Sequence, residues 1–266
     1  KDLEKKIIRA VGDPNTRFAE DALRLMRAIR IATELHFILE KKTQQSIIKN
    51  AYLLKKISRE RIRDELFKIL KSHFPSDGIL SLKNTGLLSF IIPELSKAFD
   101  VPQKSPKRHH IYDVGTHSVK SLEVCRSDNI IVRLATLLHD IGKVKTFKKD
   151  TETGLITFFN HEIIGAHTVK KIADDLRLSS QEKEKLYTLV RYHQFTVSEL
   201  QTDRAIRRFI REVGKENLSD MLILRDADRI GSGARPTSWR YELFKKRLIE
   251  VQKAPFAIKD LKIDGA

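Results

Sequence analysis

The chain has 266 residues and carries 51 lysines and arginines against 35 aspartates and glutamates, which gives it a formal net charge of +16. This length can bury a substantial core and is enough for two domains. The single cysteine excludes an internal disulfide framework and suits the cytosol, and no apolar run in the sequence is long enough to cross a membrane. So basic a chain favours a polyanionic partner.

The composition indicates a mainly α-helical protein, since there are only 11 glycines, 7 prolines and 7% aromatic residues. Leucine, isoleucine, lysine and arginine recur with a helical period in four long segments: residues 43–57, 59–71, 181–192 and 239–252. Two short apolar stretches, residues 146–148 and 156–158, flank a loop that contains Gly154. These stretches predict one short β-hairpin beside the helices.

The first motif begins at Asp13, where Asp-Pro marks a turn and a helix start. It continues as two acids followed by arginines spaced three residues apart: Glu20, Asp21, Arg24, Arg27 and Arg30. In a helix, Asp21 and Arg24 would lie on one face. They could form a surface salt bridge, or they could read the edge of a nucleobase, because together they offer an acceptor and a forked donor. Spacing alone favours the salt bridge.

His139 and Asp140 form the second motif, at the end of an apolar helix that Gly142 stops. A histidine and a carboxylate at the end of a buried helix are costly without a partner, and a divalent cation suits both. Other residues of the same kinds flank this pair at plausible spacings: His117, His161, His193 and Asp228. Mixed nitrogen and oxygen ligands suit manganese, iron, cobalt, nickel, magnesium or zinc.

This series resembles the metal site of the HD phosphohydrolase superfamily. The resemblance implies one metal ion with four ligands: His117, His139, Asp140 and Asp228. It also implies that His139 and Asp140 are catalytic and that a water activated by the metal attacks a phosphoester. His161 and His193 would complete a second metal site or contact phosphate, unless they only line the cleft. Lys143 would contact phosphate or would place its charge at the C-terminal end of the helix.

A second resemblance rests on three segments in order along the chain. Residues 20–24 match the Glu-Asp-x-x-Arg base-reading motif of class II tRNA nucleotidyltransferases and bacterial poly(A) polymerases, and residues 57–66 and 255–265 match two later family segments. The resemblance implies a protein template for the incoming CTP or ATP, with four nucleotide-binding residues: Asp21, Arg24, Arg17 and Arg27.

The catalytic head of that family binds two magnesium ions through an Asp-x-Asp pair after a glycine-rich turn, and no Asp-x-Asp on a predicted strand follows a glycine turn in this sequence. We therefore expect a fragment that lacks the head and cannot transfer nucleotides by itself. Residues 1–100 would form the nucleobase-reading helix and a helical neck, ending at a loop around Pro93 and a linker at 102–106. Residues 107–233 would form the HD domain, and residues 234–266 the start of a truncated tRNA-binding tail.

Basic clusters at residues 104–108, 204–211 and 240–247 fit tRNA better than a membrane surface, because no strongly amphipathic basic helix with exposed aromatics accompanies them. The predicted function is part of a cytoplasmic tRNA nucleotidyltransferase that adds CCA to tRNA 3′ ends, with an HD domain acting as a metal-dependent phosphatase or 2′,3′-cyclic phosphodiesterase. One alternative is an A-adding or poly(A) polymerase whose HD domain only binds RNA. Another is a stand-alone HD hydrolase of signalling nucleotides. The oligomeric state stays open.

Overall fold

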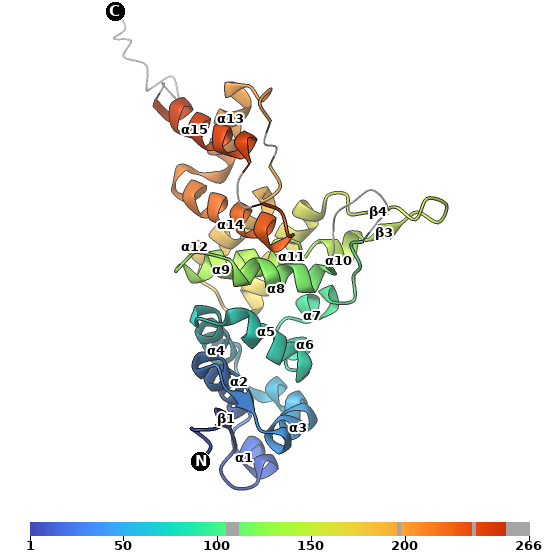
Figure 1. Ribbon diagram of the computed structural model, residues 1–266, viewed down its shortest axis with the longest axis vertical. Coiled ribbons are helices and arrows are strands. Elements are labelled where there is room, and N and C mark those ends of the chain that lie inside the picture. Colours follow the sequence, from blue (N-terminus) through green and yellow to red (C-terminus); the bar gives the residue numbers. More distant parts are fainter. Residues whose placement is uncertain (105–111, 196–197, 236–237, 254–266) are drawn as a thin grey trace, which may run out of the picture.

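The computed structural model describes residues 1–104, 112–195, 198–235 and 238–253. Helices follow one another from the N-terminal end of the molecule to the opposite end, with two small sheets among them (Figure 1). The prediction of a mainly α-helical protein is confirmed. The predicted family segment at 255–265 lies outside the described residues, as does most of the basic cluster at 104–108. Within the described part, no helix is both long and apolar enough to cross a membrane.

The N-terminal end is built from helices around a short parallel sheet, in which β1 pairs with β2. Its elements are β1 (Ile7–Ile8), α1 (Pro14–Glu20), α2 (Leu23–Leu35), β2 (Ile38–Leu39), α3 (Lys41–Asn50) and the 3-10 helix η1 (Ala51–Lys56). Asp13 begins α1 as predicted, because its carboxylate accepts a hydrogen bond from the Thr16 amide at 2.9 Å. The predicted helix at 43–57 is α3 continued by η1.

Asp21 lies between two helices rather than within one. The chain is extended at Asp21 (φ −146°, ψ 101°), and its carboxylate accepts a hydrogen bond from the Leu23 amide at 3.1 Å, at the start of α2. The prediction that Asp21 and Arg24 share one helix face is therefore wrong. Arg24 pairs with Glu20 at 2.6 Å, whereas Asp21 lies 3.4 Å from Arg27.

Four helices continue the N-terminal half: α4 (Arg59–Lys71), α5 (Pro75–Asn84), α6 (Leu88–Ile91) and α7 (Pro93–Ala98). The bounds of α4 are those that the sequence predicts. Pro93 begins α7, so the predicted loop around it is wrong; proline suits the first helical position, where no amide donor is needed. Both α4 and α5 pack against α2, and there the buried Glu65 accepts a hydrogen bond from Arg30 at 2.7 Å.

The C-terminal half contains the remaining helices and the second sheet. Its elements are α8 (Val114–Glu123), α9 (Ile130–Leu138), α10 (Lys143–Thr146), β3 (Lys148–Lys149), β4 (Ile156–Thr157), α11 (His161–Asp175), α12 (Ser180–Tyr192), α13 (Asp203–Val213), η2 (Lys215–Asn217), α14 (Leu218–Gly231) and α15 (Trp239–Lys253). The predicted helices at 181–192 and 239–252 are α12 and α15. The predicted hairpin is confirmed as the antiparallel pair of β3 and β4, although Thr146 ends α10 instead of joining a strand.

Helix α9 lies at the centre of this half. It packs against α4, α8, α12 and α14. Apart from Arg133 its residues are apolar or small, and a helix of this kind is buried on most sides. Its Leu134, Leu137 and Leu138 are fully buried. Because α9 ends at Leu138, the next two residues, His139 and Asp140, also lie in the interior.

Gly142 allows α10 to approach the start of α11. A Cβ atom at Gly142 would lie 1.9 Å from the carbonyl oxygen of His161 and 2.6 Å from the amide nitrogen of Gly165. Both neighbours are backbone atoms, so neither can turn aside. Gly142 does not stop α9, which has already ended at Leu138, but it determines how closely His161 approaches the His139-Asp140 pair.

We expect Gly142→Ala to lower the free energy of unfolding by roughly 3 kcal/mol, at the upper end of what overpacking an interior costs. Thermal or urea unfolding measures this change. Gly165→Ala is the matched control, because a Cβ there meets its nearest neighbour at 3.3 Å, and it should cost about 1 kcal/mol. Equal stabilities of the two variants would contradict the close approach at Gly142.

Candidate metal centre

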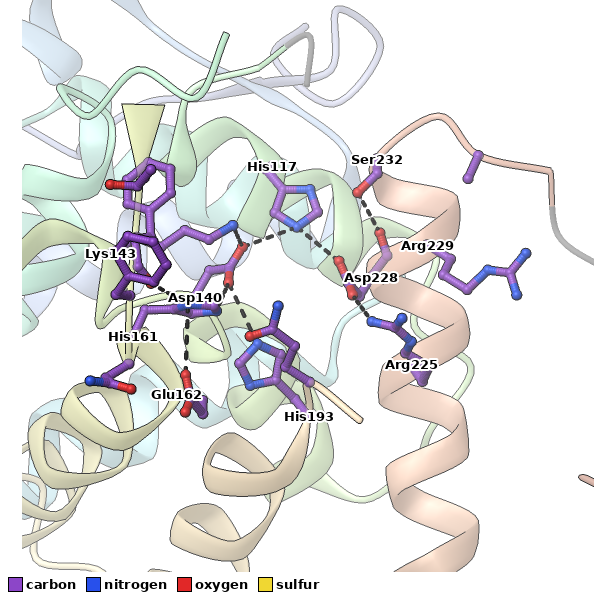
Figure 2. Close-up of a pocket in the computed structure, with 16 residues that line it drawn as sticks. His117, Asp140, Lys143, His161, Glu162, His193, Arg225, Asp228, Arg229 and Ser232 are labelled. Atoms are coloured by element: carbon purple, nitrogen blue, oxygen red, sulfur yellow. Dashed lines mark hydrogen bonds and ion pairs between the residues drawn. The ribbon is translucent and has the colours of Figure 1, made fainter. Parts of the chain in front are cut away.

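The structure brings together all six histidines and aspartates that the sequence singles out: His117, His139, Asp140, His161, His193 and Asp228. They come from α8, the end of α9, the start of α11, the end of α12, and α14. Five of them line a cavity of about 600 Å³ (Figure 2). The sixth, His139, is fully buried, and its Nε2 lies 3.1 Å from Nε2 of His117.

The six residues form two trios, and within each the candidate ligand atoms lie within 4.8 Å of one another. The first trio is His117, His139 and Asp228, and the second is Asp140, His161 and His193. In the first, Asp228 Oδ1 lies 3.2 Å from His117 Nε2 and 3.6 Å from His139 Nε2. Donors about 2.1 Å from one ion are at most about 4.2 Å apart, so the first trio already has the spacing of a metal site.

Three of the histidines are oriented by the same backbone contact. In each, Nδ1 lies within hydrogen-bond distance of the carbonyl oxygen three residues earlier: His139 with Thr136 (2.7 Å), His161 with Phe158 (2.9 Å) and His193 with Val190 (2.8 Å). Nδ1–H donates to the carbonyl, so in the neutral ring Nε2 carries the lone pair and is directed at the cluster. Metal-binding histidines are usually fixed in this way.

Asp140 is shared between the two trios. Its Oδ2 lies 3.5 Å from His117 Nε2 and 3.4 Å from His139 Nε2. Its Oδ1 lies 3.4 Å from His161 Nε2 and 3.6 Å from His193 Nε2 (Figure 2). Each oxygen of this carboxylate therefore faces one pair of histidines, and Asp140 would be a candidate ligand for an ion at either trio.

Lys143 partly neutralises Asp140 from the wall of the cavity. Its buried Nζ lies 2.6 Å from Asp140 Oδ2 and donates to Gln103 Oε1 at 2.7 Å. Lys143 begins α10, a helix of four residues, and its charge is directed at the Asp140 carboxylate. The contact with phosphate stays a prediction for this residue, which lines the cavity.

The two carboxylates remain ionised although Asp140 is buried and Asp228 is largely shielded from solvent. Burial would raise the pKa of Asp140, but Lys143 and His139 hold it well below its usual range. Burial is likewise outweighed at Asp228, whose pKa is also held low by neighbouring histidines. Burial disfavours a proton on His139, but the two carboxylates outweigh it and raise the pKa of His139 to about 10. The cluster thus favours a positive charge, and its mixed nitrogen and oxygen donors fit a divalent cation.

Arg225 and Gln103 belong to the site, although the sequence did not single them out. Arg225 lies one turn before Asp228 on α14 and donates to its Oδ2 at 3.0 Å, while Oδ1 faces His117. The three-residue spacing of an arginine and an aspartate on a helix could have indicated this pair. Gln103 precedes its partner Lys143 by 40 residues and lies in a loop, so no local pattern could have indicated it.

The predicted nucleotide-binding residues gather in the N-terminal half, away from the metal cluster (Figure 1). Arg17, Arg24 and Arg27 line one cavity of about 410 Å³. Asp21 lies beside this group, 3.4 Å from Arg27 and 3.7 Å from Arg61. The structure therefore brings the three arginines to one cavity, with Asp21 joined to them through Arg27.

Two family models match the chain. One is described as the probable RNA- and SrmB-binding site of polymerase A and matches residues 36–99; the other is the HD domain and matches residues 108–232. The A-adding tRNA nucleotidyltransferase of Deinococcus radiodurans is 34% identical over 257 residues, covering 93% of this chain and 58% of that protein. The CC-adding tRNA nucleotidyltransferase of Thermus thermophilus is 29% identical, covering 91% of this chain and 57% of that protein.

Solved structures with a similar fold include the Bacillus stearothermophilus CCA-adding enzyme in complex with CTP, with a TM-score of 0.63 and 23% identity. That likeness covers 94% of this chain and 52% of the other. The Thermotoga maritima CCA-adding enzyme complexed with tRNA has a TM-score of 0.59 and 15% identity, over 100% of this chain and 58% of the other. At these identities the likeness shows a shared fold, and this chain spans little more than half the length of its relatives.

We expect Asp140→Asn to abolish stabilisation of the chain by divalent ions, because it removes the charge that both trios share. Manganese or nickel at 100 times its dissociation constant should raise the free energy of unfolding of the unaltered chain by about 2.7 kcal/mol, read as a rise in Tm. Asp100→Asn alters an exposed carboxylate outside the cluster and should respond like the unaltered chain. A rise in Tm that persists in Asp140→Asn would contradict the site.

Proposed function

We propose that this chain, a member of the tRNA nucleotidyltransferase and poly(A) polymerase family that carries an HD domain, combines a nucleotide-reading segment with a metal-dependent phosphohydrolase site. The observation that carries the hydrolase is the convergence of four histidines and two aspartates on one cavity. Sequence similarity to enzymes named for nucleotide addition to tRNA supports the nucleotide-reading segment.

At the proposed metal site, His117, His139, Asp228 and Asp140 would hold one ion. His161, His193 and Asp140 would hold a second. When bound, divalent cations supply Lewis acidity toward a phosphoester and activate water for attack. The proposed substrate is a phosphate monoester or a 2′,3′-cyclic phosphate. The metal could be manganese, nickel, cobalt, iron, magnesium or zinc, since all accept these donors.

Three cationic side chains on the cavity wall would bind and orient the phosphoester. Lys143, Arg225 and Arg229 line the cavity together with the candidate ligands (Figure 2). Arg225 also donates to Asp228 Oδ2 at 3.0 Å, which holds its guanidinium group beside the candidate ligands. Guanidinium groups suit this role because their planar forks match phosphate oxygens.

We expect His161→Ala to reduce manganese- or nickel-dependent hydrolysis of adenosine 2′,3′-cyclic phosphate by more than about 100-fold, beyond the loss typical of a residue that only supports a ligand. The bound metal, measured by elemental analysis, should fall from two ions to one. His167→Ala is the matched control, since His167 is exposed on the same helix, α11. If the unaltered chain hydrolyses nothing with any of these metals, the HD domain is better regarded as an RNA-binding scaffold.

The proposed nucleotide-reading site is the cavity lined by Arg17, Arg24 and Arg27. Its apolar wall includes Phe18 and Ile31, which suits a base, and its guanidinium groups suit phosphates or the base edge. Arg24 is held in place here by donating to Glu20 Oε2 at 2.6 Å and to the Arg17 carbonyl at 3.1 Å. We propose that this segment takes part in adding CCA to tRNA 3′ ends from CTP and ATP.

Replacing Arg24 with alanine in the full-length protein should raise KM for CTP and ATP roughly tenfold or more and weaken the choice between them, since one forked base contact contributes about 1–3 kcal/mol. Nucleotide addition to a tRNA transcript that lacks its CCA end measures both effects. Arg126→Ala alters an exposed arginine of the other half and should leave addition unchanged. Unaltered preference in Arg24→Ala would count against the reading role, and addition of A alone by the unaltered protein would contradict CCA addition.

A further inference from the structure

Three cavities in the C-terminal half share their walls. The metal cavity and a smaller cavity of about 410 Å³ are both lined by Glu162 and Gln194. The smaller cavity in turn shares Ala205 and Arg208 with a groove of about 940 Å³ along α13. The cavity beside Arg191 therefore lies between the metal cavity and one face of α13 and adjoins both.

That face of α13 consists of arginines: Arg204, Arg207, Arg208 and Arg211. Residues three or four apart on a helix share a face, and the opposite face buries the apolar residues Ile206, Phe209, Ile210 and Val213. Three of the arginines are exposed, namely Arg204, Arg208 and Arg211. Within the described residues, Arg204 and Arg211 form no hydrogen bond or ion pair.

Nearby acids leave this face positively charged. Asp203 is paired with Arg247 of α15, and Glu212 approaches Arg208 only to 4.0 Å. From Arg204 to Arg211 the helix rises about 10 Å. A row of guanidinium groups of this length matches several successive phosphates better than a single phosphate.

An exposed aromatic ring lies at the metal cavity. Phe159 lines this cavity with 75% of its surface exposed, whereas the neighbouring Phe158 is buried and packs against Phe147. Proteins that bind single-stranded nucleic acids combine a basic groove along the backbone with aromatic rings on which bases stack. A phosphopeptide would use the arginines but would have no flat base to place on Phe159.

We propose that the arginine face of α13 binds a single-stranded nucleic acid whose phosphorylated end enters the metal cavity, where the terminal base stacks on Phe159. This inference rests on the proposed phosphohydrolase function and names its substrate class as an oligonucleotide end. At a terminal 2′,3′-cyclic phosphate, water adds across one P–O bond: its oxygen goes to phosphorus and a proton goes to the departing ribose oxygen. Arg204, Arg208 and Arg211 bind phosphates further along the strand and take no part in this step.

The test compares hydrolysis of adenosine 2′,3′-cyclic phosphate with that of an oligoadenylate of about ten nucleotides that ends in the same cyclic phosphate, using this chain in manganese. We expect KM for the oligomer to be lower by about tenfold or more, because several phosphate contacts add to affinity. Arg204→Glu/Arg208→Glu/Arg211→Glu should remove this advantage and leave kcat and KM for the mononucleotide unchanged. The plot of log affinity for the oligomer against log salt concentration should become less steep by about 2, because each lost phosphate contact with a single strand removes ~0.7 from the slope.

The matched control is Lys41→Glu/Lys42→Glu/Lys49→Glu, which makes the same change of charge at three exposed lysines of α3, in the other half of the molecule. It should keep the preference for the oligomer. Phe159→Ala should weaken oligomer binding about fivefold or more, as expected for one lost stacking contact. The same variant should bind inorganic polyphosphate as the unaltered chain does.

Each outcome decides one part of the proposal. Equal KM values for the two substrates, unaffected by the triple arginine variant, would overturn the α13 surface and leave the hydrolase in place. If the chain hydrolyses neither substrate, the proposed phosphohydrolase function is overturned. In that case, fluorescence anisotropy with a labelled oligoadenylate tests the α13 surface independently of hydrolysis. Loss of binding in the triple arginine variant would support the surface, and unchanged binding would overturn it. Polyphosphate bound as tightly as the oligomer, with no effect of Phe159→Ala, would overturn the assignment to nucleic acid.

Discussion

The carboxylate of Asp140, buried at the end of an apolar helix, is the constraint on which the C-terminal half depends. An ionised carboxylate in an interior requires compensating charge and hydrogen bonds. Lys143 supplies charge from one side, and the adjacent His139 and three histidines from other segments converge on its two oxygens. The close packing at Gly142 keeps the start of α11 near this carboxylate. The same convergence that satisfies Asp140 produces a donor set suited to divalent cations.

Helix α4 connects the two halves and explains why the sequence segment at 57–66 matters structurally. On one side, Arg61 lies 3.7 Å from Asp21 and Glu65 accepts a hydrogen bond from Arg30. On the other side, Arg59 donates to the carbonyls of residues 90 and 91 at 2.9 Å and pairs with the carboxylate at the end of α11. The start of α11 carries His161. One helix therefore contacts both the surroundings of the nucleotide-reading residues and an element of the metal cluster.

The sequence predicted helices well where one face or the whole surface is apolar, as in α4, α9 and α12. It failed where a helix ends and another begins within a few residues, as at Asp21, because the acids and arginines there also fit a continuous helix. Pro93 was misread for a related reason, since proline marks both loops and the first turn of helices. The six candidate ligands were all identified, because histidines and aspartates on apolar segments are unusual. The sequence did not indicate that Asp140 also lies beside His161 and His193, and it did not indicate the supporting Gln103.

The sequence by itself determined the helical class, the short hairpin and the residue types available for a metal and for a nucleotide, because hydrophobic period and donor chemistry are local properties of the chain. Only the tertiary structure decided that Asp140 presents one oxygen to each trio, that Lys143 and Gln103 meet, and that adjoining cavities lie between the metal cluster and the arginines of α13. These relations join segments far apart in the chain. They depend on how closely helices pack and in which direction each side chain leaves its helix, which no local pattern specifies.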